Sequence, residues 1–155
     1  MGVAFLLSQL GANATMKFAA RLEPFGLVPS EAGVLHHIAR GTGISQQVLA
    51  ERLGILPSRM VALVDSLEKR GIVERRRDVE DRRAYALHLT ESGKKIMEDL
   101  MAARRAHEDS LLSGLDEKER AQLQVLCSKM AEAQGLTPGV HPGYKFMGRK
   151  GSPKH

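Results

Sequence analysis

Tryptophan is absent from this chain of 155 residues, and aromatic residues make up only 4% of it. The core must therefore be built from Leu, Ile, Val, Met and Ala, which favours packing between helices over a β-sandwich. Proline is missing from residue 58 to residue 137, so long helices can run there without interruption. These absences predict one mainly helical domain with a small β component.

Cysteine occurs once, at Cys127, so the chain cannot form a disulfide within itself. No Cys/His cluster has the spacing of a zinc site, and no complete motif of an enzyme active site is found. No apolar run approaches the ~20 residues that a membrane helix needs. We expect a cytoplasmic protein that is not an enzyme and has no cofactor, metal or membrane partner. Cys127 is expected to be a buried thiol, with redox sensing as the alternative.

The net charge of +5 is concentrated at the C-terminus. Residues 137–155 carry four basic residues and no acidic one, whereas residues 1–136 carry 19 basic and 18 acidic residues. The total charge alone is therefore weak evidence for a nucleic-acid partner. Because residues 137–155 are also rich in Pro and Gly, they are expected to form a basic tail.

Hydrophobic periodicity predicts six helices and two short strands. The helices are expected at about 3–22, 30–40, 45–54, 57–70, 91–113 and 116–134, and the strands at 72–77 and 84–89. Ser45, Thr90 and Asp116 are suitable N-cap residues, and Asp116 forms a capping box with Glu119. The polar loop 78–83 is expected to close a hairpin between the strands.

Residues 49–61 (LAERLGILPSRMV) have the pattern of a helix-turn-helix. Gly54 permits a left-handed turn, and the second helix buries a stripe that includes Met60 and Leu67. That leaves Ser58 and Arg59 exposed at its N-terminus, where such helices meet base edges, and Arg can bond guanine with two hydrogen bonds. The alternative is an ordinary solvated helix pair.

The hairpin that follows holds five arginines within residues 75–83. Arginines at a narrow hairpin tip can enter the minor groove, although such a charge run can also be a solvated edge strand. Asp65 would repel phosphate on a DNA-facing helix. We therefore expect Asp65 to pair with an arginine of the hairpin, with Arg83 as the first choice, and to orient it.

Taken together, these segments resemble the multiple-antibiotic-resistance regulator (MarR) family over about residues 5–134. The similarity is carried by residues 49–55 (LAERLGI), 63–75 (LVDSLEKRGIVER), 78–83 (DVEDRR) and 89–93 (LTESG). The Asp-Arg-Arg between two strands, followed by Leu-Thr-x-x-Gly, is the specific part. The resemblance implies a winged helix-turn-helix with flanking dimerisation helices.

The resemblance also implies a regulator that binds double-stranded DNA as a homodimer on a palindrome. It implies repression, with release by a small aromatic or anionic effector. The expected parts are an N-terminal dimerisation helix (1–29), the winged helix-turn-helix (30–90), C-terminal dimerisation helices (91–136) and the tail (137–155). Predicted DNA contacts are Gln46, Ser58, Arg59, Ala62, Lys69, Arg75, Arg77, Arg82 and Arg83, and the predicted wing-orienting residues are Asp65 and Asp81.

A second function remains open at this point. Winged helices sometimes bind proteins with the same surface, so the chain could be a protein-interaction module without specific DNA binding. Salt dependence separates the two, because DNA affinity falls by about 0.9 log units per log unit of salt for each phosphate that is neutralised.

Overall fold

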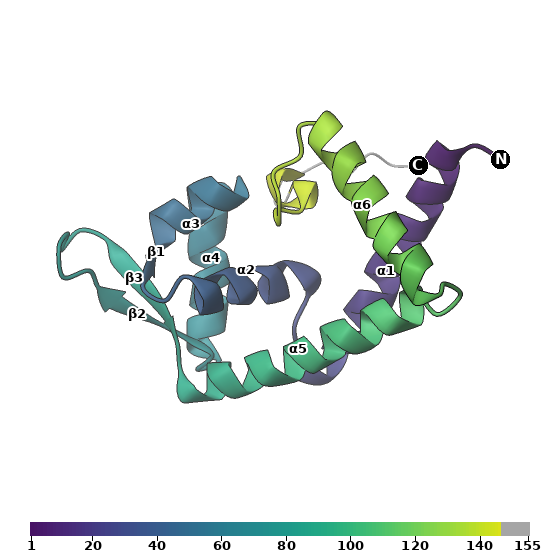
Figure 1. The fold of residues 1–155 in the computed structure, drawn as a ribbon. Coiled ribbons are helices and arrows are strands. Elements are labelled where there is room, and N and C mark those ends of the chain that lie inside the picture. The colour runs from purple at the N-terminus through teal and green to yellow at the C-terminus, as the bar shows by residue number, and fades with distance from the viewer. Residues whose placement is uncertain (147–155) are drawn as a thin grey trace.

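The computed structural model describes residues 1–146 and is mainly helical, with one small antiparallel sheet (Figure 1). This confirms the predicted fold class. The helices are α1 (Val3–Leu22), η1 (Glu23–Phe25), α2 (Pro29–Arg40), α3 (Gln46–Leu53), α4 (Pro57–Lys69), α5 (Glu91–Leu111), α6 (Glu117–Ala133) and η2 (Pro142–Phe146). The strands are β1 (Ile44–Ser45), β2 (Val73–Arg77) and β3 (Tyr85–Leu89). Within residues 1–146, no helix has both the length and the apolarity that a membrane crossing requires.

The sheet has the order β1-β3-β2, and β1 was not predicted. Ile44 pairs with Leu87 and Ser45 with Ala86, so β1 fixes the start of α3 to the hairpin. A two-residue strand is too short to show alternation in a sequence. The predicted cap at Ser45 is confirmed, because its side chain accepts a hydrogen bond from the Val48 amide at 3.2 Å.

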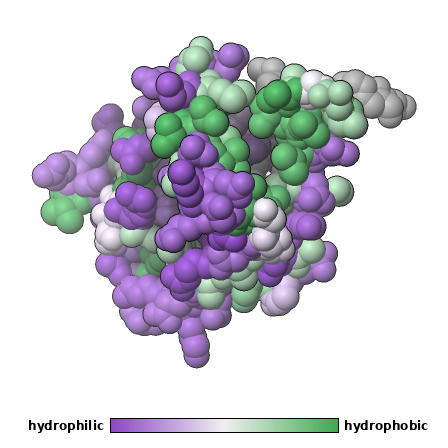
Figure 2. Space-filling model, turned by 45° about the vertical axis from the view of Figure 1, so that its right-hand side comes forward, coloured by the Kyte–Doolittle hydropathy of each residue, from purple (hydrophilic) through white to green (hydrophobic). Residues whose placement is uncertain are grey.

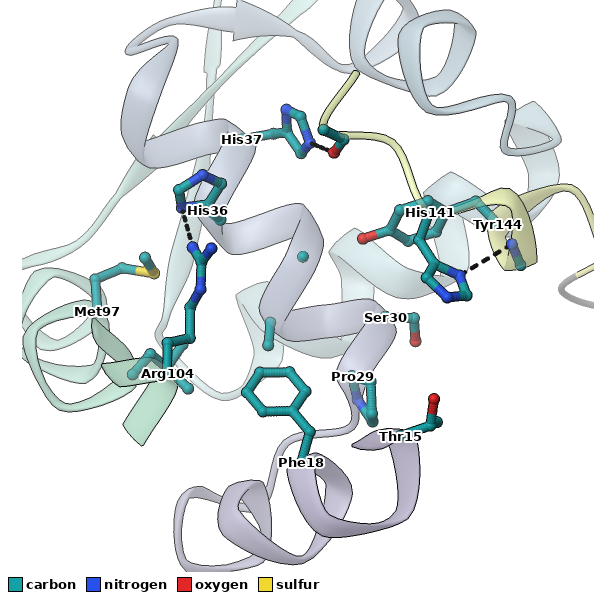
Figure 3. Close-up of a pocket in the computed structure, with 15 residues that line it drawn as sticks. Thr15, Phe18, Pro29, Ser30, His36, His37, Met97, Arg104, His141 and Tyr144 are labelled. Atoms are coloured by element: carbon teal, nitrogen blue, oxygen red, sulfur yellow. Dashed lines mark hydrogen bonds between the residues drawn. The ribbon is translucent and has the colours of Figure 1, made fainter. Parts of the chain in front are cut away.

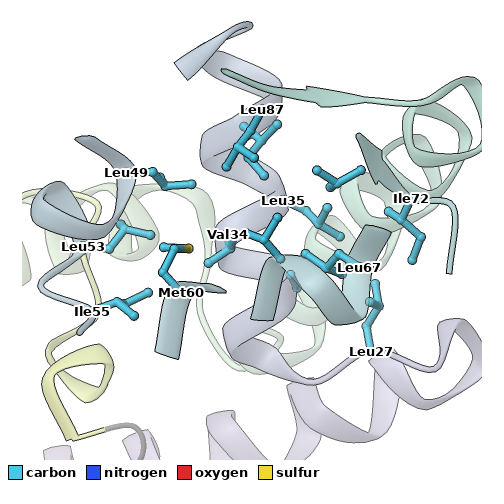
Figure 4. Packing of buried hydrophobic residues seen from close by; sticks show 14 of the residues in the cluster. Leu27, Val34, Leu35, Leu49, Leu53, Ile55, Met60, Leu67, Ile72 and Leu87 are labelled. Atoms are coloured by element: carbon cyan, nitrogen blue, oxygen red, sulfur yellow. The ribbon is translucent and has the colours of Figure 1, made fainter. Parts of the chain in front are cut away.

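A single apolar core holds α2, α3, α4 and the sheet together (Figure 4). Met60, Val64 and Leu67 of α4 are fully buried, as the helical stripe predicts. Gly54 closes the turn between α3 and α4 at φ 66°, a left-handed conformation that a β-carbon would strain. The core therefore fixes the angle between the two helices of the helix-turn-helix.

The Leu-Thr-x-x-Gly segment joins this unit to the long helix α5. Thr90 caps α5 by accepting a hydrogen bond from the Gly93 amide, and its hydroxyl donates to the carbonyl of Gly71 at 2.5 Å. A β-carbon at residue 93 would lie 2.0 Å from the carbonyl oxygen of Ile72. Glycine is therefore required where the first turn of α5 crosses the chain that enters β2.

The helices α1 and α6 lie at the other end of α5 (Figure 1). Leu22 is the buried residue of α1, and α6 contains none. Large apolar side chains of these helices are exposed in the single chain, among them Val3, Phe5, Leu6, Leu7, Leu10, Met16, Val125, Leu126 and Met130. Figure 2 shows apolar side chains gathered on this side of the molecule.

Residues 137–146 are folded onto the rest of the chain, whereas the sequence predicted only a basic tail rich in Pro and Gly. Pro142–Phe146 form the 3-10 helix η2, and Tyr144 is buried, with 8% of its surface exposed. The rest of the expected tail, residues 147–155, lies outside the described residues. Cys127 also differs from expectation, because its side chain is exposed on α6 in the single chain.

Candidate nucleic-acid interface

Helix α4 presents a short polar surface at its N-terminal end. Pro57 occupies its first turn, and Ser58, Arg59 and Ala62 are all exposed there. Since the opposite face carries the buried stripe, these three residues face away from the core. A helix N-terminus also attracts anions through its free amide groups. This end of α4 is therefore exposed and free of the core, and its contact with DNA stays a prediction.

The hairpin of β2 and β3, with its loop, is the wing. Asp65 is paired with an arginine of the wing, but this arginine differs from the expected one. Its carboxylate lies 2.7 Å from the guanidinium of Arg75 on β2, not beside Arg83. Arg75 and Val73 point to the same face of β2, which is the face turned toward α4. Arg83 follows Asp81 in the loop beyond the strand, so the prediction of Arg83 as the partner is wrong.

Arg75 is a hub between the wing and the helix-turn-helix. Its guanidinium donates to Glu68 at 2.7 Å and to Gln46 at 2.8 Å, and Glu68 also accepts from the Arg75 amide. The Arg75 side chain is only 14% exposed. The structure thus turns the side chains of Gln46 and Arg75, both predicted DNA contacts, toward each other. We expect them to position the wing, and direct DNA contact by either stays a prediction.

The loop of the wing is shaped by two aspartates. The Asp81 carboxylate accepts from the amide of Arg83 at 2.9 Å, and the Asp78 carboxylate accepts from the amide of Glu80 at 2.9 Å. Asp81 therefore acts on the backbone of the loop, at the place where it can orient the arginine side chains. The role of Asp78 was missed because a carboxylate that accepts from a nearby loop amide has no sequence signature beyond its turn propensity. The role of Glu68 was missed because its partner Arg75 lies on a different element.

The remaining arginines of the wing differ in whether their side chains are paired with other groups of the protein. Arg76 pairs with Glu74, and Arg77 donates to the carbonyl of Arg82 at 3.1 Å. In the described part of the chain, the side chains of Arg82 and Arg83 make no ion pair, and both are exposed at the wing tip. Lys69 is exposed at the far end of α4. The tip of the wing thus offers guanidinium groups without a carboxylate partner, whereas Arg75 and Arg76 on β2 are paired with carboxylates.

A cavity of about 540 Å³ lies between the winged unit and the helices α1 and α5 (Figure 3). Its apolar wall includes Phe18, Met97 and Leu100, and its polar groups include His36 and Arg104. The guanidinium of Arg104 donates to Nδ1 of His36 at 3.2 Å. Burial, followed by the nearby charge of Arg104, lowers the pKa of His36, so this imidazole is neutral at pH 7. The sequence had offered one of the adjacent histidines His36 and His37 as a pocket-lining residue, with one packed and one surface imidazole as the alternative, and both line this cavity.

Comparison with known proteins shows which family has this arrangement. The profile of the MarR family matches residues 25–84, which span the helix-turn-helix and most of the wing. The chain is also 30% identical over 112 residues to the HTH-type transcriptional repressor MdtR of Bacillus subtilis, which is 72% of each chain. The chain belongs to the MarR family. Because its MarR relatives are transcriptional regulators, the chain is likewise a transcriptional regulator and not an enzyme.

Solved structures of MarR proteins share the fold over most of the chain. A MarR transcriptional regulator from Methanosarcina mazei Go1 has a TM-score of 0.75 and 27% identity, covering 85% of this chain and 95% of its own. The S. aureus MepR–DNA complex has a TM-score of 0.74 and 24% identity, covering 86% and 98%. At that identity, the MepR likeness is evidence for the MarR fold alone.

Proposed function

We propose that this MarR-family chain is a repressor that binds a palindromic DNA operator as a homodimer and responds to a small aromatic acid. The observation that carries the DNA-binding part is the pairing of two exposed surfaces, the N-terminal end of α4 and the arginine tip of the wing. Arg75 fixes these surfaces relative to each other through Asp65 and Glu68. We further propose DNA as the partner and the cytoplasm as the site of action.

Each surface has its own task in this proposal. Ser58, Arg59 and Ala62 meet base edges in the major groove, where the donor and acceptor pattern differs for every base pair. Arg82 and Arg83 enter the adjacent minor groove, and Arg77 and Lys69 contact the sugar-phosphate backbone. The related MepR was solved in complex with DNA, which supports this use of the fold.

Homodimerisation is proposed from the exposed apolar surface of α1 and α6. Phe5 and Leu10 of α1 are 57% and 53% exposed, and Leu126 of α6 is 58% exposed. Contiguous apolar surface of this kind marks an interaction site, and most soluble oligomers are symmetric homo-oligomers. A two-fold dimer would cover these helices and present two α4 helices to the two halves of a palindrome.

The cavity between the winged unit and α5 is the proposed effector site. Phe18, Met97 and Leu100 suit an aromatic ring, and Arg104 can pair with a carboxylate through two hydrogen bonds. Because the cavity is lined by both the winged unit and the dimerisation helices, an occupant can change how the two are placed. The proposal of an aromatic acid follows from this combination of apolar wall and single guanidinium.

The DNA-binding mode predicts different effects for Arg59 and Arg83. We expect Arg59→Ala to weaken binding to the best operator by about 10- to 100-fold and to relax the preferred sequence, since one bidentate base contact contributes about 1–3 kcal/mol. Arg83→Ala should instead weaken binding to all duplexes and reduce the salt slope by about 0.9. Selection from randomised duplexes and titrations at several salt concentrations measure both effects.

Arg76→Ala is the matched control, because it removes the same charge from a wing arginine that is already paired with Glu74. Its salt slope should stay near that of the unmodified protein. Binding of both test variants at the unmodified affinity would contradict the site. A protein with no salt-dependent hold on any duplex would favour the protein-interaction module instead.

The effector site predicts that Arg104→Gln impairs the response to an anionic ring. With benzoate as the probe, we expect the unmodified protein to bind and the variant to bind about tenfold more weakly, since a hydrogen bond to a charged group contributes about 1.5–3 kcal/mol. Calorimetric titration measures the change. Benzamide, which has the same shape without the charge, should bind both proteins alike. Equal benzoate affinity for both proteins would show that Arg104 does not bind the charged group of the effector.

A further inference from the structure

The C-terminal segment after α6 returns to the winged unit and docks on it. The carbonyl of Gly139 accepts a hydrogen bond from Nε2 of His37 on α2, at 3.3 Å. Tyr144 joins the main apolar core, and Lys145 lies beside Gly54 in the turn between α3 and α4. Residues 137–146 thus connect the end of a proposed dimerisation helix to the helix-turn-helix. We refer to residues 137–146 as the strap.

The contact between Tyr144 and α2 is unusually close. A β-carbon built on Gly33 would lie 1.7 Å from the Tyr144 hydroxyl oxygen and 3.0 Å from the ring carbon that bears it. Any other residue at position 33 would therefore collide with the docked ring. Gly33 lies in the middle of α2, where glycine is unfavourable for the helix by about 1 kcal/mol relative to alanine. The close approach of Tyr144 explains why glycine is present at this position.

The strap also forms one wall of the cavity (Figure 3). Gly139, His141, Gly143 and Tyr144 line the cavity on one side, and Phe18 and Arg104 line it on others. His141 is held by the amide of Gly143, which donates to its Nδ1 at 3.0 Å. An occupant of the cavity would therefore touch the strap and α5 at the same time. Without the strap, the cavity loses the wall that faces α2 residues His37 and Gly33.

We propose that the strap is a movable wall whose docking on Gly33 completes the effector site and couples its occupancy to the helix-turn-helix. This inference rests on the effector part of the proposed function. A ligand that touches the docked strap binds that state more tightly than the open state, so it must stabilise docking. By the same linkage, loss of docking must weaken ligand binding by an equal factor.

The first test reads docking without any ligand. In the full chain, Gly33→Ala should speed amide hydrogen exchange in residues 137–146 by about tenfold or more, because the added methyl group displaces Tyr144. Tyr144→Ala should have the same effect. In the Tyr144→Ala background, adding Gly33→Ala should not speed amide exchange of the strap any further. The double variant should melt at a higher temperature than Tyr144→Ala alone, since alanine favours the helix. Unchanged exchange in Gly33→Ala would overturn the docked strap.

The second test adds benzoate to the same four proteins. Benzoate should slow exchange of the strap in the unmodified protein and bind each undocked variant about tenfold more weakly. At a fixed benzoate concentration, the operator affinity of the unmodified protein should change by several-fold more than that of the undocked variants. If benzoate binds the four proteins alike, the strap is wrong and the effector site stands. If benzoate fails to bind the unmodified protein, both the effector site and the strap coupling are wrong. The Arg59 and Arg83 variants test DNA binding separately.

Discussion

Replacing Arg75 with alanine should weaken operator binding by about 30-fold without removing a DNA contact. The substitution deletes the group that ties the wing to Asp65, Glu68 and Gln46, and it leaves two carboxylates facing each other without a cation. Loss of a partly buried charged hub costs about 2 kcal/mol, between the values for exposed and buried ion pairs, and 1.4 kcal/mol is a tenfold change in affinity. The wing then samples many orientations.

The salt dependence of binding separates this positioning role from a direct contact. If Arg75 only holds the wing, the slope of log affinity against log salt should stay as it is, whereas loss of a phosphate contact would lower the slope by about 0.9. Arg75→Lys is the matched variant, since it keeps the charge but cannot bond Gln46, Asp65 and Glu68 together. It should resemble Arg75→Ala. Full recovery of operator affinity by Arg75→Lys would show that charge alone matters and would contradict the positioning role of Arg75.

The largest expected effect belongs to the dimerisation surface. The double variant Leu10→Glu/Leu126→Glu should be monomeric and should bind a palindromic operator at least about 100-fold more weakly, because two half-sites are no longer joined at millimolar effective concentration. Each buried leucine contributes about 1.5–3 kcal/mol, so the four leucines of a dimer contribute on the order of 6–12 kcal/mol. Sedimentation velocity and operator titration measure the two effects.

A control for added charge is available on the same helices. Gln9→Glu/Gln122→Glu introduces equal charge on α1 and α6 at exposed polar positions, without removing apolar surface. This variant should remain dimeric and bind the operator within about threefold of the unmodified protein. A double leucine variant that stays dimeric at micromolar concentration would place the subunit interface elsewhere on the molecule.

Local features of the fold were predictable because their causes lie close together in the sequence. The capping box at Asp116 and Glu119 forms as expected, with hydrogen bonds of 2.8 and 2.9 Å. The stripe of α4 and the glycine turn at Gly54 follow from helical spacing and from the conformational freedom of glycine. Such features need only the identity of residues a few positions apart, so the amino-acid sequence alone is enough to locate the helices and the wing.

Contacts between distant segments were not predictable in the same way. Five arginines could have faced Asp65, and strand alternation was the available signal, since it puts Arg75 on the same face as buried Val73. Docking of Tyr144 on Gly33 joins residues more than a hundred positions apart, and a Pro- and Gly-rich composition gave no reason to expect it. Apart from His36 and His37, the lining of the cavity was missed for the same reason, because its walls come from α1, α2, α5 and the strap.

The helix α5 runs without interruption and connects the two ends of the molecule, so a rotation at one end is transmitted to the other. Its 21 residues span about 31 Å at 1.5 Å per residue. One end is fixed under the wing by Thr90 and Gly93, and the other lies beside α1 and α6. A tilt of about 10° at one end would move the other by about 5 Å, more than the 3.4 Å rise of one base pair. A small rotation at the cavity can therefore shift α4 out of step with the groove.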